Sequence, residues 1–334
     1  MKAAVWKGLD HLDIDDWPIP TPEGPHDVQI RVAACGVCGT DYHILEGKFP
    51  VFDPPRVIGH EYVGTVTAVG ARVSRVKVGD RVAVEQGLPC DTCYFCRDGR
   101  EHLCNNRYAH PGGFAEYTCV AERMCHTLPD GLAWEIGALA EPVACALRVM
   151  DMVQIRSGDV ALVQGGGTIG CIMTQLLLRG GISKVVQSEP VAHRREIARA
   201  VGASVVVDPR TEDLAAVLMR ETDGLGPEYT FDCVGHHKLL EEGIRLVQKG
   251  GTVFVVGVAD PAGIAEVKPY ELFLKELRIM SSYMRPYTFA RAVRWLPHLD
   301  LSPIIGVEYP LEKTKEAILA LRKSQQGCKI LVKP

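Results

Sequence analysis

The chain has 334 residues with 37 basic and 41 acidic side chains. Proteins that bind duplex nucleic acid usually carry a basic excess, so this balance argues against a nucleic-acid partner. The chain has 12 cysteines, and its N-terminal residues lack the apolar run of a signal peptide. We therefore expect a cytoplasmic protein whose thiols are reduced. The length and the apolar share of 47% suit two globular domains and exclude a disordered chain.

Residues 1–130 contain short strand-like runs separated by turns that are rich in glycine, proline and aspartate. The clearest runs lie at 28–34, 62–69 and 81–85. This pattern predicts an irregular β domain.

After Glu141, strand-like and helical segments alternate. A buried strand is predicted at 159–164, followed by a glycine turn and a helix from Thr168 to Arg179. Five further strand-like runs surround Val185, Val205, Phe231, Val253 and Ile279. Alternation of this kind predicts an α/β fold with a doubly wound parallel sheet. Because the tail returns to short mixed elements, we predict a nucleotide-binding domain at 146–281, inserted into a β domain made of 1–145 and 282–334.

Residues 160–178 carry no charge over about the length of a membrane span. Two glutamines and four glycines interrupt this segment, however, and favour a strand, a glycine turn and a helix. We therefore expect no contact with a membrane.

The glycine turn has the pattern of a dinucleotide-binding loop. Gly165, Gly167 and Gly170 form G-x-G-x-x-G around Thr168 and Ile169, directly after a predicted strand and at the start of a predicted helix. Such glycines let a pyrophosphate approach the backbone N–H groups at the helix N-terminus. Glu189, at the end of the next strand, can accept hydrogen bonds from an adenosine ribose. A solvated loop charge is the alternative interpretation of Glu189.

Four cysteines are concentrated in fifteen residues, at Cys90, Cys93, Cys96 and Cys104. Four thiolates can close a tetrahedral structural zinc site. An iron–sulfur cluster is the main alternative, but bacterial ferredoxin runs have a shorter last gap and a proline after the final cysteine. Four exposed, unligated thiols would be prone to oxidation. The spacing therefore favours zinc.

A second group of metal-binding side chains is formed by Cys38, His60 and Glu61. Taken singly, each has an ordinary structural explanation: a core thiol, a buried histidine, a surface charge. Together they offer a thiolate, an imidazole and a carboxylate, the three protein ligands of a catalytic zinc with one open position.

These motifs together identify a resemblance to the zinc-dependent medium-chain dehydrogenase/reductase family over essentially the whole chain. The matching segments are Cys38-Gly-Thr-Asp with His43, Gly59-His-Glu, Val78-Gly-Asp-Arg-Val, the four-cysteine lobe, Gly112-Gly-Phe-Ala-Glu-Tyr, Ala140-Glu-Pro and the glycine turn. The chain looks most like the polyol, butanediol and threonine dehydrogenase branch. The resemblance implies a GroES-like catalytic domain beside a Rossmann domain.

The resemblance also implies roles for single residues. Cys38 and His60 match catalytic zinc ligands, and Glu61 matches the ligand or near ligand of this branch. Glu141 matches a glutamate that binds this zinc directly or through water. Asp41 matches a carboxylate that orients the ligand histidine, and Thr40 and His43 match a proton relay. The four-cysteine lobe would hold the second of two zinc ions per chain, and the family implies a homotetramer.

The activity implied is NAD-linked oxidation of a secondary alcohol, in a polyol, sugar derivative, vicinal diol or hydroxy amino acid such as L-threonine. The Arg-Tyr pair of animal sorbitol dehydrogenases is not reproduced, because Arg285 is displaced by one position. This departure leaves the substrate and the role of Arg285 open. Two other functions are alternatives to this activity. One is a zinc-free quinone or enoyl reductase, which would not need Cys38, His60 and Glu61 together with the four-cysteine lobe. The other is a non-catalytic oligomer that only binds a nucleotide.

NAD is the expected cofactor, because the Glu189 carboxylate would repel the 2′-phosphate of NADP. Arg194 and Arg195 are five and six residues further on and could pair with such a phosphate instead. Arginine at the position of Arg194 also occurs in NAD-linked relatives, so it does not decide between the two cofactors.

Overall fold

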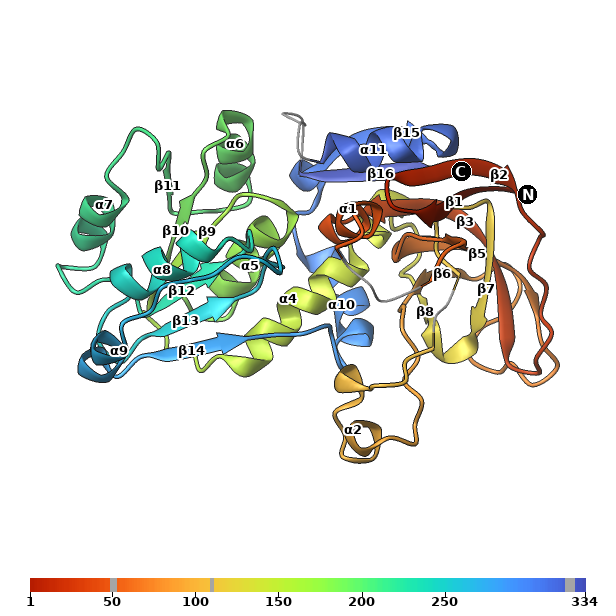
Figure 1. Cartoon of the computed structure of the whole chain (residues 1–334), viewed down its shortest axis with the longest axis horizontal. Coiled ribbons are helices and arrows are strands. Elements are labelled where there is room, and N and C mark those ends of the chain that lie inside the picture. The colour runs from red at the N-terminus through yellow and green to blue at the C-terminus, as the bar shows by residue number, and fades with distance from the viewer. Residues whose placement is uncertain (49–52, 109–110, 322–327) are drawn as a thin grey trace.

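The computed structural model describes residues 1–48, 53–108, 111–321 and 328–334. The molecule has two halves side by side, an α/β half and a β-rich half that carries both chain termini (Figure 1). The helices α4 (Ala140–Met152) and α10 (Phe289–Trp295) pack together between the two halves (Figure 1).

In the described residues, the β-rich half contains two sheets. The smaller one has the order β2 (His11–Asp16), β1 (Lys2–Gly8), β4 (Arg56–Val57). The larger one has the order β15 (Ile305–Pro310), β16 (Lys329–Lys333), β3 (Asp27–Val37), β5 (Glu61–Val69), β6 (Arg81–Val84), β8 (Cys125–Thr127), with β7 (Tyr117–Ala121) also on β3. The predicted strands at 28–34, 62–69 and 81–85 are confirmed.

Period-two burial explains the central strand of this sheet. In β3, Val28, Ile30 and Val32 are buried, whereas Gln29 and Arg31 between them point away from the core. The C-terminal strand β16 pairs antiparallel with β3, which explains why the tail of the chain returns to this half.

The α/β half contains a six-stranded parallel sheet. Its order is β11 (Val205–Val207), β10 (Lys184–Ser188), β9 (Val160–Gln164), β12 (Tyr229–Asp232), β13 (Thr252–Val255), β14 (Arg278–Ser281). The chain reverses direction across the sheet between β9 and β12, and ligands of such sheets bind outside the carboxyl ends of the strands at this point. The predicted doubly wound α/β fold is confirmed, and the predicted helix at 168–179 is α5 (Thr168–Arg179).

Successive residues of each strand face opposite sides of this sheet, and helices cover both faces. Ala161 and Val163 of β9 belong to a core cluster with α4, α5 and α10, whereas Leu162 packs with Leu218 and Leu246 on the other side. Leu218 and Leu246 come from α7 (Leu214–Glu221) and α8 (His237–Leu246).

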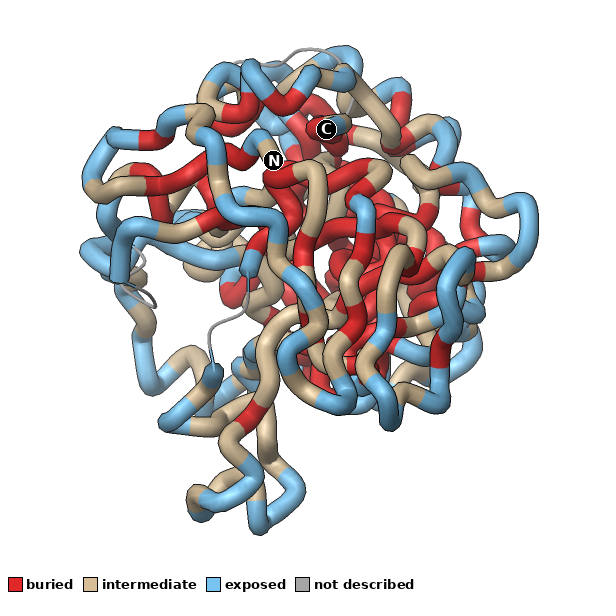
Figure 2. Tube along the Cα trace, turned by 90° about the vertical axis from the view of Figure 1, so that its right-hand side faces the viewer, coloured by how far each residue is buried: buried red, intermediate tan, exposed pale blue. Residues whose placement is uncertain are grey.

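The remaining helices are short. They are α1 (Gly39–Leu45), α2 (Tyr94–Arg97), η1 (Glu101–Leu103), η2 (Glu122–Met124), α3 (Trp134–Gly137), α6 (Ala192–Ala200), α9 (Pro269–Lys275), η3 (Leu296–His298), η4 (Ser302–Ile304), η5 (Leu311–Lys313) and α11 (Thr314–Ala320). The helices α2 and η1 belong to the four-cysteine lobe, which projects from the body of the molecule (Figure 1). Figure 2 shows that this lobe is mostly exposed or half-buried.

A search of the described helices finds none with the length and hydropathy of a bilayer span. The uncharged segment 160–178 is divided among β9, the glycine turn and α5. The domain limits at 145/146 and 281/282 stay predictions; the first falls inside α4 and the second directly after β14.

Candidate active site

A cleft of about 1150 Å³ lies between the two halves of the molecule. The β-rich half contributes Cys38, His60 and Glu61 to its wall, and the α/β half contributes the glycine turn with Glu189. The predicted metal site and the predicted dinucleotide turn therefore open into the same space.

The possible ligand atoms of Cys38, His60 and Glu61 all lie within 4.8 Å of one another. Cys38 directly follows β3 and caps α1, while Glu61 begins β5 and is paired with Gly36 of β3. A Cβ atom at Gly36 would lie 2.2 Å from a carboxylate oxygen of Glu61, so only glycine at this position lets the carboxylate approach β3. A thiolate, an imidazole and a buried carboxylate fit a zinc ion.

Asp41 holds two members of this set. Its buried carboxylate accepts a hydrogen bond from the backbone N–H of Cys38 at 2.9 Å, and its other oxygen lies 3.5 Å from Nδ1 of His60. Burial lowers the pKa of His60, but Asp41 and Cys38 outweigh this effect and leave the pKa well above its usual value. Binding of a metal ion would therefore displace a proton from this imidazole.

Lys329 is a buried cation that sequence reasoning did not find. Its ammonium group pairs with Glu61 and donates a hydrogen bond to the Val37 carbonyl at 3.2 Å. Burial would lower the pKa of Lys329, but the Glu61 carboxylate raises it above the ordinary value, so this side chain stays charged. The only sequence signal was a lysine at the start of an apolar C-terminal strand.

Glu141 lines the same cleft, but it does not belong to the set of three within 4.8 Å. Its carboxylate pairs with the buried guanidinium of Arg285 at 2.8 Å. Burial opposes ionisation, yet Arg285 and His60 hold the pKa of Glu141 below its usual value. A buried carboxylate–guanidinium pair therefore lies beside the candidate metal site.

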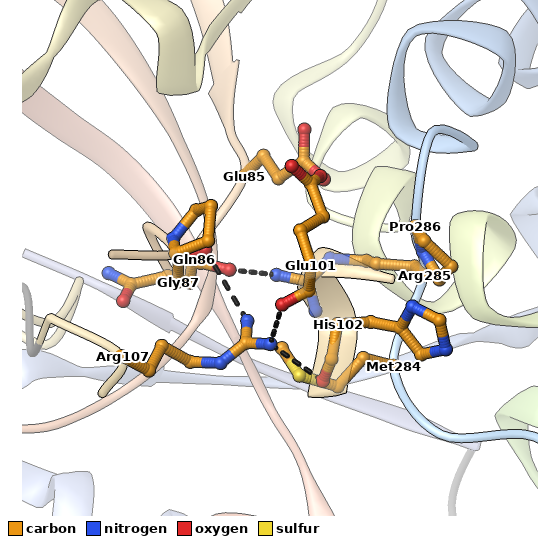
Figure 3. Close-up of a pocket in the computed structure, with 10 residues that line it drawn as sticks. Glu85, Gln86, Gly87, Glu101, His102, Arg107, Met284, Arg285 and Pro286 are labelled. Carbon is orange, nitrogen blue, oxygen red and sulfur yellow. Dashed lines mark hydrogen bonds between the residues drawn. The ribbon is translucent and has the colours of Figure 1, made fainter. Parts of the chain in front are cut away.

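Arg285 also connects this pair to the segment that leads into the four-cysteine lobe. It donates a hydrogen bond to the Gln86 carbonyl at 2.7 Å (Figure 3). In the same view, Arg107 donates hydrogen bonds to the carbonyls of Glu101 at 3.0 Å and His102 at 2.7 Å (Figure 3). These two arginines thus hold the base of the lobe beside the cleft through hydrogen bonds to backbone carbonyls. The sequence predicted a role for neither of them.

The candidate relay residues both lie on α1 and line the cleft. The Thr40 hydroxyl lies 3.7 Å from the Cys38 sulfur, which places it next to the candidate metal site. His43 follows almost one helical turn later. Thr40 thus lies beside one of the candidate metal ligands, with His43 further along the same helix.

The four cysteines of the lobe also converge, with all four sulfurs within 4.8 Å of one another. A hydrogen bond from the Thr92 hydroxyl lowers the pKa of Cys90 to about 6, whereas burial and the neighbouring thiols raise that of Cys96 to about 12. Four adjacent thiols do not ionise together without a cation, so this donor set suits a structural zinc ion.

The glycine turn has the geometry of a nucleotide-binding loop. Gly165 has a φ of +102°, and a Cβ atom at Gly170 would lie 2.0 Å from the Gly165 carbonyl oxygen. Thr168 and Ile169 line the cleft beside them. The closely packed turn leaves the N-terminus of α5 open to the cleft, as a bound pyrophosphate requires.

Glu189 is buried behind this turn rather than exposed on a loop. One carboxylate oxygen accepts a hydrogen bond from the Gly166 N–H and the other from the Val191 N–H, each at 2.7 Å. Arg194 lines the same cleft, whereas Arg195 is bound to Asp208 at 2.9 Å. Of the two arginines, only Arg194 lines this cleft.

Comparison with known proteins agrees with this geometry. Residues 24–130 match the model of the alcohol dehydrogenase GroES-like domain, and residues 168–297 match that of the zinc-binding dehydrogenase. D-arabinitol dehydrogenase 1 of Uromyces fabae is 33% identical over 92% of this chain and 90% of its own length. L-threonine 3-dehydrogenase of Caldanaerobacter subterraneus is 31% identical over 92% of both chains.

Two solved structures are similar over 100% of this chain and 99% of their own. A protein of Sinorhizobium meliloti described as a zinc-binding dehydrogenase, bound to NADP, is 31% identical with a TM-score of 0.94. An alcohol dehydrogenase of Escherichia coli CFT073 complexed with NADH is 29% identical with a TM-score of 0.91. Matched by both family models in chain order and by relatives along nearly its full length, the chain belongs to the zinc-dependent medium-chain dehydrogenase/reductase family.

Proposed function

We propose that this protein is a zinc-dependent dehydrogenase that transfers hydride between a secondary alcohol and NAD. The observation that carries this proposal is the cleft in which Cys38, His60 and Glu61 face the dinucleotide turn. Neither a zinc-free reductase nor a protein that only binds nucleotides would need this ligand set.

Zinc bound to Cys38, His60 and Glu61 would lower the pKa of an alcohol, and the nicotinamide of NAD would accept the hydride. The chain's own residues orient these groups and move the proton. Asp41 fixes the Cys38 backbone and the His60 ring, as carboxylates beside metal ligands commonly do. The Thr40 hydroxyl takes the proton of the alcohol, and His43 passes it on to water.

A polyol or a related secondary alcohol is the substrate we favour, with L-threonine as the alternative. D-arabinitol dehydrogenase 1 supports the first and L-threonine 3-dehydrogenase the second, at similar identity. A panel of pentitols, hexitols, inositols, butanediol and L-threonine, assayed with NAD by absorbance of the reduced cofactor, tests both. Turnover of no secondary alcohol in this panel would contradict the proposal.

We also propose a homotetramer in the cytoplasm. The strand β14 is paired on one side only in the described sheet, and Ile279 on it is exposed. Nearby on α9, Tyr270, Phe273 and Leu274 are exposed as well. An unpaired edge strand with apolar neighbours favours pairing with a second copy.

The proposed cytoplasmic location is supported by the state of the cysteines. All 12 cysteines are free thiols, which suits a reducing compartment.

The first prediction concerns metal content. Cys38→Ser should remove one of two zinc ions per chain and nearly all turnover, because this site serves the reaction. Cys96→Ser should remove the other ion and lower stability, because the lobe is closed by four thiolates. Elemental analysis and thermal unfolding measure both effects, with Cys119→Ser as the control outside both groups. Two retained ions and normal turnover in Cys38→Ser would refute the assignment.

The second prediction concerns the proton relay. Thr40→Ala should lower kcat towards the upper end of the roughly 10²- to 10⁴-fold range of general acid–base catalysis, because its hydroxyl contacts the reacting oxygen. His43→Gln should cost less, since water can replace it, and the loss should be greatest at low pH. Zinc content should not change in either variant. Equal pH–rate profiles for wild type and Thr40→Ala would exclude the relay.

The third prediction concerns the buried pair of Arg285 and Glu141, which we propose positions the Glu141 carboxylate beside the zinc. Arg285→Met should lower the free energy of unfolding by about 3–5 kcal/mol, because it leaves a buried carboxylate unpaired. Adding Glu141→Gln should recover part of the loss. The control is Arg291→Met, which breaks the exposed pair with Asp151 and should cost about 0–1 kcal/mol. Urea unfolding compares these three variants with the wild type, and no recovery in the double variant would contradict the coupling.

The fourth prediction concerns the cofactor. Wild type should have a higher kcat/KM for NAD than for NADP, because a 2′-phosphate would lie against the buried Glu189 carboxylate. Glu189→Ala should lose much of this preference, and Arg194→Ala should lower the residual rate with NADP. The NADP in the Sinorhizobium meliloti structure makes this a sharp test. A wild type that prefers NADP would overturn the proposal.

A further inference from the structure

Two thiols meet at one carbonyl oxygen directly beneath the dinucleotide turn. Cys171, in the first turn of α5, donates a hydrogen bond to the Gly166 carbonyl at 3.4 Å. Cys328, next to the start of β16, donates to the same oxygen at 3.1 Å. Because they share one acceptor atom, sulfurs that are far apart in the sequence and belong to opposite halves of the molecule are neighbours.

The two thiols differ in their access to solvent. Cys171 is fully buried, whereas Cys328 is half-buried and lines the cofactor cleft. A small molecule that enters the cleft therefore reaches Cys328 first and finds Cys171 immediately behind it. Neither thiol belongs to the two groups of candidate zinc ligands.

We propose that Cys171 and Cys328 form a redox-modification site, a dithiol that a hydroperoxide converts to a disulfide across the two halves of the molecule. Cys328 is the residue attacked first, and Cys171 resolves the intermediate. Accessible, reactive thiols with a second cysteine beside them are the usual arrangement of such sites.

The oxidation balances in two steps. The Cys328 sulfur attacks the O–O bond of the hydroperoxide and becomes a sulfenic acid, while the leaving oxygen takes up the Cys328 proton. The Cys171 sulfur then attacks the sulfenic sulfur, the S–S bond forms, and the hydroxyl group leaves as water with the Cys171 proton. The two thiols lose two electrons in total, and the peroxide gains them.

The mutual interaction of the thiols supports this order of events. Interaction with the neighbouring Cys171 lowers the pKa of Cys328, and the same interaction raises the pKa of Cys171 well above its usual value. The accessible thiol is thus the one that ionises more readily, and thiolates are the nucleophiles of thiol chemistry.

A disulfide here would change the cofactor site. It would remove both S–H donors from the Gly166 carbonyl, in the turn where a pyrophosphate should bind. It would also tie α5 of the α/β half to the segment that carries Lys329, which contacts Glu61 at the metal site. We therefore expect the oxidised protein to bind the cofactor more weakly.

The experiment treats the zinc-loaded protein with hydrogen peroxide and maps its peptides by mass spectrometry without reduction. A peptide that links Cys171 to Cys328, with the mass lowered by two hydrogens, should accumulate and disappear with dithiothreitol. NADH affinity, measured by fluorescence titration, should fall by about tenfold or more in the oxidised protein. Bound NADH should also slow formation of the linked peptide, because Cys328 lines the cleft that the cofactor would occupy.

Three variants complete the test, each compared with its own reduced form. Cys171→Ser and Cys328→Ser retain a donor for the Gly166 carbonyl but cannot form the bond, so peroxide should leave their NADH affinity nearly constant. Cys233→Ser is the matched control, since this thiol lines the same cleft and should leave the peroxide response intact. Absence of the linked peptide in the wild type, or an equal affinity loss in Cys328→Ser, would overturn the proposal. The peptide measurement does not depend on the proposed dehydrogenase activity.

Discussion

The site depends on the antiparallel pairing of β3 with β5 and with β16. These strands bring residues 36–38, 60–61 and 329 into one place, although they are far apart in the sequence. Gly36 is the position at which a side chain would displace the Glu61 carboxylate, because Glu61 occupies the space that a Cβ would need. Backbone pairing thus brings the candidate ligands together.

The same cleft must bury several charges at once, and each buried carboxylate near the metal site has a partner. Glu61 is paired with Lys329, Glu141 with Arg285, and Asp41 with the Cys38 backbone. Since unpaired buried charges are strongly destabilising, these partners are as necessary as the ligands themselves. They keep a carboxylate-rich site compatible with a stable fold.

Much of this arrangement followed from local patterns. The alternating strands and helices after residue 141, the glycine turn and the four-cysteine run are short-range features with a direct physical meaning. The doubly wound parallel sheet, the helix at 168–179 and the grouping of the four thiols agree with the structure. The roles proposed for Thr40, His43, Arg194 and the zinc ligands remain for experiments to test.

The sequence by itself determined the fold class, the family and both groups of candidate metal ligands, because each is encoded in residue spacing within one short segment or in motifs of fixed order. The tertiary structure alone decided which distant cations balance the buried carboxylates. Lys329 belongs to no motif and the sequence left the role of Arg285 open, since both ion pairs join segments that are far apart in the chain. It also decided that Cys171 and Cys328 share one acceptor, because that contact depends on how two separate parts of the chain meet at the Gly166 carbonyl.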